Sequence, residues 1–136
     1  MRVSPLRPPA PLHRTMLIVL AVFYLTAGVL HILAPDGFLP IVPDFVPFPR
    51  LTVLLTGVCE IAGAIGLVVP RVRRAAGWAL AAYAIAVFPA NIKHAVYLIP
   101  AGGLPQSWWY HGPRLAMQPV LVWLALYCGG IIGRKN

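Results

Sequence analysis

The sequence predicts an all-α protein, an integral membrane four-helix bundle whose two chain ends both lie in the cytoplasm. Hydrophobic residues make up 60% of the 136 positions and charged residues 10%, compared with about 25% charged in an average soluble protein. The apolar residues gather in four runs, 16–34, 51–69, 75–100 and 115–133, each close to the roughly 20 residues that cross hydrocarbon. Basic residues between the runs fall mainly on one side, which sets the orientation.

Residues that end helices separate the four runs. Five prolines between positions 35 and 49 break any helix between the first two runs, and Pro70 ends the second. Residues 101–105 predict a turn, and Gly112-Pro113 places a proline where the fourth helix is expected to begin. Pro89 lies inside the third run, where it removes one backbone hydrogen bond, so we expect a kink there.

The segments outside the runs define the domain organisation and the topology. Residues 1–15 are rich in proline and arginine and predict a flexible basic tail, residues 16–133 form the membrane domain, and residues 134–136 are a short basic end. The first run is longer than the roughly 7–15 apolar residues of a signal peptide, so we expect an uncleaved span. The tail, the 71–74 loop and the basic end carry eight basic residues. This excess predicts cytoplasmic termini. The net charge of +8 therefore fits membrane topology better than a surface that binds nucleic acid.

Polar residues inside the runs are the candidates for function. Ionisable groups cost free energy in hydrocarbon and usually face the interior of a helix bundle. Glycines recur every third residue beside Glu60, where small side chains let a neighbouring helix approach closely. At about 1.5 Å per residue, most of the polar residues fall in the outer half of the bilayer. We predict that one outward-facing ligand pocket gathers six of them: His31, Glu60, Asn91, His94, Arg114 and Gln118.

Each candidate also has a structural interpretation. A packing role between helices would explain Glu60, and a position at the membrane interface would explain His31 and Lys93. A hydrogen bond to the carbonyl that Pro89 leaves free would explain Asn91. Arg114 and Gln118 suit loop caps or lipid headgroups, and Trp108 and Trp109 suit an interfacial belt. Imidazole and carboxylate groups can bind transition metals, but no metal-ligand spacing is present, so no metal site is predicted. Catalytic residues stay unassigned.

Five short motifs follow one another along the chain: Ala27-Gly28-x-x-His31, Gly57-x-x-Glu60-x-x-Gly63-Ala64, Pro70-x-x-Arg73, Phe88-Pro89-Ala90-Asn91, and Arg114 with Gln118. Together, in this order, they resemble the DoxX family. The resemblance covers residues 16–133 and implies a four-helix bundle in the cytoplasmic (inner) membrane of a bacterium. It further implies a redox setting, because one member is the membrane subunit of a thiosulfate:quinone oxidoreductase and others are linked to redox maintenance or to maturation of exported enzymes. The chain lacks the cysteine pair of the thiol-based relatives.

These features lead to one expected function and two alternatives. We expect an accessory membrane protein that binds a partner or an apolar small molecule, such as a quinone, in the outward-facing pocket. The first alternative is a membrane subunit of a quinone-linked oxidoreductase, in which Glu60 or His31 relays protons. The second is a small-solute transporter, which would have to oligomerise. The expected partners are the lipid bilayer and either a second copy or an exported or membrane redox protein, with no nucleic acid.

Overall fold

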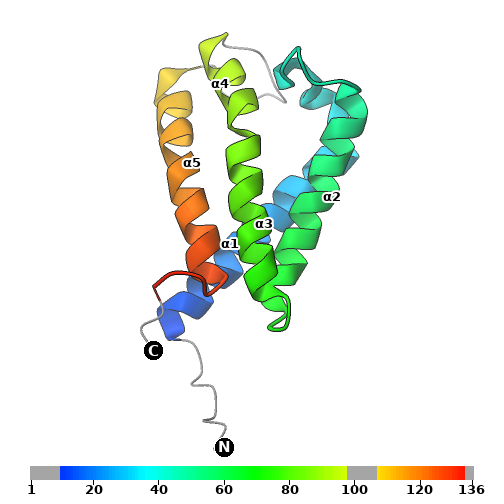
Figure 1. Cartoon of the computed structure of the whole chain (residues 1–136). Helices are drawn as coiled ribbons and strands as arrows, with labels where there is room; N and C mark the ends of the chain where they lie inside the picture. Colours follow the sequence, from blue (N-terminus) through cyan, green and yellow to red (C-terminus); the bar gives the residue numbers. More distant parts are fainter. Residues whose placement is uncertain (1–9, 98–106, 134–136) are drawn as a thin grey trace, which may run out of the picture.

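The computed structural model describes residues 10–97 and 107–133, and every regular element within these ranges is a helix (Figure 1). The prediction of an all-α fold is therefore confirmed. Two short 3-10 helices lie between the first and second α-helices. The elements are α1 (Pro11–Leu33), η1 (Pro35–Gly37), η2 (Leu39–Ile41), α2 (Pro49–Val68), α3 (Arg73–Ala86), α4 (Phe88–Val96) and α5 (Trp108–Cys128).

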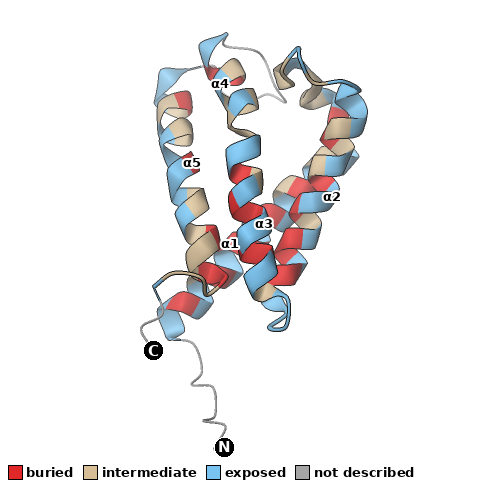
Figure 2. Cartoon of the chain, viewed as in Figure 1, coloured by how far each residue is buried: buried red, intermediate tan, exposed pale blue. Residues whose placement is uncertain are grey.

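Three helical segments are long and apolar enough to cross a membrane: Pro11–Leu33, Pro49–Val68 and Arg73–Val96. They correspond to the first three predicted runs, and α5 is not among them. The first half of α5 contains His111, Arg114 and Gln118, whose polar side chains lower its hydropathy. Many large apolar side chains of the helices are exposed, and Figure 2 shows exposed residues along every labelled helix. Such broad apolar exposure is rare in soluble proteins and is compatible with a membrane protein.

Two helices begin earlier in the sequence than predicted. Helix α1 starts at Pro11, inside the predicted tail, because proline is well tolerated in the first turn of a helix. Helix α5 starts at Trp108, and the Oγ atom of Ser107 caps it by accepting a hydrogen bond from the Trp109 N–H at 3.3 Å. Pro113 therefore lies inside α5 and does not begin it. The predicted tail 1–9, turn 101–105 and basic end 134–136 lie outside the described residues.

The third predicted run is broken, and not merely kinked, near Pro89. Helix α3 ends at Ala86, and its last backbone bond joins the Val87 N–H to the Tyr83 carbonyl at 3.0 Å. Helix α4 starts at Phe88, so that only Val87 separates the two helices. Pro89 lies in the first turn of α4, where its missing N–H costs least. The two helices continue in nearly the same direction (Figure 1).

Close helix crossings hold the bundle together. A Cβ atom added to Gly28 of α1 would lie 2.7 Å from the carbonyl oxygen of Gly57 in α2, so the two backbones touch there. At the other end of α1, the His13 ring bonds the Tyr127 carbonyl of α5 at 3.1 Å. We call this the terminal end of the bundle, and the opposite end, which carries residues 34–48 and the start of α5, the loop end. The hydrophobic core joins α1, α2, α3 and α5, and includes Leu17, Leu20, Tyr24, Leu67, Leu80 and Cys128.

Candidate functional site

Five of the six predicted pocket residues fall into two separate groups, and the sixth, Gln118, belongs to neither. The glutamate group joins α1, α2 and α3 and contains His31 and Glu60, together with Tyr83. The arginine group joins α4 to α5 and contains Asn91, His94 and Arg114. Figure 1 shows that α2 and α5 lie on opposite sides of α3 and α4. No hydrogen bond or ion pair recorded between described residues links the two groups.

Glu60 is the centre of the first group and is only 4% exposed. Its Oε1 atom accepts a hydrogen bond from the Tyr83 hydroxyl at 2.7 Å. Its Oε2 atom lies 3.0 Å from Nδ1 of His31, but the N–H geometry favours the Ala27 carbonyl, which is 2.7 Å from the same nitrogen. Oε2 therefore has a close contact with the histidine ring and no hydrogen bond among the described residues.

Aromatic rings enclose the glutamate group on two sides. Phe38, from the loop between α1 and α2, stacks on the His31 ring with a centroid distance of 3.9 Å and an angle of 17°. Tyr24 packs edge-on against Tyr83 at 6.1 Å, and its own buried hydroxyl has no hydrogen bond among the described residues. The group is thus a compact polar core between three helices, which agrees with the packing interpretation of Glu60 as well as with a functional one.

Arg114 is the centre of the second group and bonds two neutral acceptors. One terminal nitrogen donates to Nδ1 of His94 at 2.6 Å, and the other donates to Oδ1 of Asn91 at 2.8 Å. Because a guanidinium group can only donate, Nδ1 of His94 carries no proton in this contact. The carbon Cζ of Arg114 also lies 5.7 Å from the centre of the Tyr110 ring, within cation–π range. Asn91 thus accepts a hydrogen bond from Arg114. The sequence interpretation did not include this contact.

His111 belongs to the arginine group and was missed in the sequence interpretation. Its ring is fully buried and lies 4.7 Å from the His94 ring. Neither ring nitrogen has a hydrogen bond among the described residues. The spacing of three and four residues between His111, Arg114 and Gln118 places all three on one helix face. This signal was hidden because the fourth run was expected to begin at residue 115, which left His111 in a loop.

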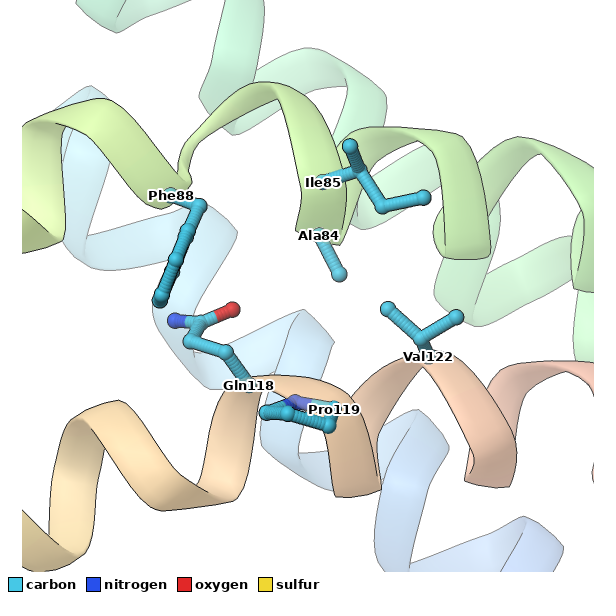
Figure 3. Close-up of a pocket in the computed structure, with 6 residues that line it drawn as sticks. All are labelled: Ala84, Ile85, Phe88, Gln118, Pro119 and Val122. Atoms are coloured by element: carbon cyan, nitrogen blue, oxygen red, sulfur yellow. The ribbon is translucent and has the colours of Figure 1, made fainter.

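A small cavity lies beside the arginine group, between α5 and the break that separates α3 from α4. It has a volume of about 160 Å³, and Figure 3 shows the Gln118 side chain reaching from α5 toward Phe88. Gln118 is 9% exposed, and its Oε1 atom has no hydrogen bond among the described residues. Ile85 is 64% exposed, so the cavity opens to the outer surface of the helices. The lining residues are Ala84, Ile85, Phe88, Gln118, Pro119 and Val122.

Two ion pairs connect the loop between α1 and α2 to α4 and to the start of α2. Lys93 donates to Oδ1 of Asp44 and to the Val42 carbonyl, both at 2.8 Å, and Arg50 pairs with Asp36. Lys93 therefore forms hydrogen bonds with this loop. The sequence had suggested instead that its side chain extends to the membrane interface. The chain has three acidic side chains, and all three are engaged away from Arg114: Asp36 by Arg50, Asp44 by Lys93, and Glu60 by Tyr83 and His31.

The fold and the two polar groups define an all-helical protein with three apolar segments of membrane-spanning length and several polar side chains buried between its helices. The chain belongs to the family described as domain of unknown function DUF8561, whose model matches residues 20–128. The resemblance to DoxX is therefore wrong, because the family model that matches the chain is a different one. No curated protein and no solved structure matches the chain.

Proposed function

We propose that this protein is a membrane-embedded binding protein that holds an amphiphilic small molecule between α5 and the α3–α4 break. The observation that carries the proposal is Gln118, which lies beside an apolar cavity and whose buried amide oxygen has no hydrogen bond within the described part of the chain. A buried polar atom without a partner costs about 1–3 kcal/mol, and a ligand with a hydrogen-bond donor would recover that cost.

The size of the cavity supports a ligand that is only partly enclosed. A volume of about 160 Å³ is below the roughly 300–1,000 Å³ of sites that enclose a drug-sized molecule. A segment of acyl chain or a single ring fits such a space, while the rest of the ligand would lie along the exposed faces of α3 and α5. Lipids and quinones are both amphiphiles of this shape.

We further propose that the loop end, and with it the ligand site, faces the outside of a bacterial cytoplasmic membrane. The support is the distribution of charge, because Arg14, Arg71, Arg73 and Arg74 lie at the terminal end, whereas the basic residues of the loop end are engaged by loop carboxylates or by the arginine group. The oxidoreductase and transporter alternatives stay predictions from the sequence. The redox interpretation depended partly on the DoxX resemblance and loses that support.

Filling the cavity tests the binding function. Val122 lines the cavity, whereas Val120 on the same helix is 40% exposed and does not line it. We expect Val122→Phe to abolish co-purification of the ligand from mild detergent, as measured by mass spectrometry of small molecules bound to the intact protein. Val120→Phe, which adds the same volume outside the cavity, is the matched control. Equal ligand content in both variants would contradict the proposed site.

A further inference from the structure

None of the three acidic side chains of the sequence pairs with Arg114. All three acidic side chains are engaged elsewhere, and the segments outside the described residues contain no Asp or Glu. The groups that Arg114 does bond, Asn91 and the unprotonated Nδ1 of His94, are neutral. A charge placed among membrane helices is costly without an opposite charge, so the missing counter-charge must come from another molecule.

The donors around Arg114 indicate the chemistry of that molecule. The Nε–H of the guanidinium group has no hydrogen bond among the described residues, and a guanidinium group presents five N–H donors in a fork that matches oxyanions. His111, which is fully buried, also has no hydrogen bond at either ring nitrogen. A neutral imidazole has one N–H to donate. The site therefore offers an arginine fork and a histidine donor, which together suit a carboxylate or a phosphate ester.

The cavity supplies the second half of the binding site. Helices α4 and α5 run in opposite directions (Figure 1), so the step from Phe88 to Asn91 and the step from Gln118 to Arg114 both lead toward the loop end. Each step is about one helical turn, or roughly 5 Å. The charged group thus lies directly beyond the apolar cavity, with Gln118 between them. A molecule with an anionic head and an apolar tail would contact both at once.

We infer that the arginine group binds the head of an anionic amphiphile, a carboxylate or a phosphodiester, while its tail enters the cavity beside Gln118. This inference rests on the proposed binding function and names the class of its ligand. The neutral partners Asn91 and His94 orient the guanidinium group without cancelling its charge, which keeps that charge for the ligand. An internal carboxylate in their place would have closed the site.

Matched ligands that differ in charge at the head test the inference. Purified protein in a neutral detergent is titrated with oleate and with oleyl alcohol, which have the same tail, and binding is measured by native mass spectrometry. Charge-assisted hydrogen bonds are stronger than neutral ones, so we expect oleate to bind about tenfold more tightly or better. Arg114→Gln should remove this preference, and Arg114→Lys should keep part of it. Arg50→Gln, at an arginine already paired with Asp36, should leave the preference unchanged.

The outcomes separate this inference from the proposed function. Equal binding of oleate and oleyl alcohol by the native protein would overturn the anionic head and leave the binding function in place, whereas binding of neither would overturn both. Retained preference in Arg114→Gln would also overturn the inference. If that variant does not fold, the native comparison and Arg114→Lys still decide. In nanodiscs, preference for phosphatidylglycerol over phosphatidylcholine identifies a lipid source. Inorganic phosphate that binds as tightly as oleate would overturn the amphiphile.

Discussion

At the level of single residues, a hydrogen bond from Tyr83 to Glu60 joins α3 to α2. One carboxylate oxygen has the Tyr83 hydroxyl as its donor, and the other lies close to the His31 ring. The cost of burying ionisable groups singled out Glu60 and His31 in the sequence. Tyr83 was overlooked because tyrosine is common at membrane interfaces, and only the packing of α3 against α2 brings its hydroxyl to the carboxylate.

Removing the Tyr83 hydroxyl should destabilise the bundle. In Tyr83→Phe the buried carboxylate of Glu60 loses its hydrogen-bond donor, and we expect the free energy of unfolding to fall by about 1–2 kcal/mol. Titration with a denaturing detergent, followed by circular dichroism, measures the change. Tyr127→Phe is the matched control, because the contact of Tyr127 with His13 uses its backbone carbonyl. Similar losses in both variants would show that the Tyr83 hydroxyl has no special role.

At the level of elements, the contact between α1 and α2 depends on two glycines that face each other. A Cβ atom at Gly57 would lie 2.9 Å from the Gly28 carbonyl oxygen, and a Cβ atom at Gly28 would lie 2.7 Å from that of Gly57. The recurrence of glycines beside Glu60 in α2 predicted that another helix approaches closely there. The sequence did not reveal which helices would meet, since small residues are also frequent in α3, where Gly77 approaches Gly129.

A single added methyl group should disturb this crossing. Helix propensity alone predicts that Gly28→Ala stabilises a helix by about 1 kcal/mol. Steric overlap with the Gly57 backbone opposes that gain, and we expect a net loss of about 1–3 kcal/mol from overpacking. Unfolding in a denaturing detergent measures it, with Ala62→Val on the exposed face of α2 as the control for added bulk. A more stable Gly28→Ala protein would mean that α1 and α2 can separate without cost.

At the level of the whole molecule, hydropathy predicted the helical regions well and the binding site only in part. Four apolar runs marked where helices form, because burial in hydrocarbon acts on every residue of a run. The sequence placed the six candidate residues in one pocket, whereas five of them belong to two separate groups and Gln118 lines the cavity. Periodicity defines which face of a helix is polar, and it does not define which neighbour that face meets. The break at Val87 and the early start of α5 depend on local backbone contacts that a run of apolar residues conceals.

The orientation of the molecule can be tested with single cysteines at its two ends. In a background where Cys59 and Cys128 are replaced by serine, Phe45→Cys places a thiol at the loop end and Val72→Cys places one at the terminal end; both native side chains are exposed. Neither change alters a charge, so the basic residues that set the topology are preserved. In intact bacterial cells we expect a membrane-impermeant maleimide to label Phe45→Cys, and to label Val72→Cys only after the membrane is permeabilised. The reverse pattern would place the ligand site on the cytoplasmic side.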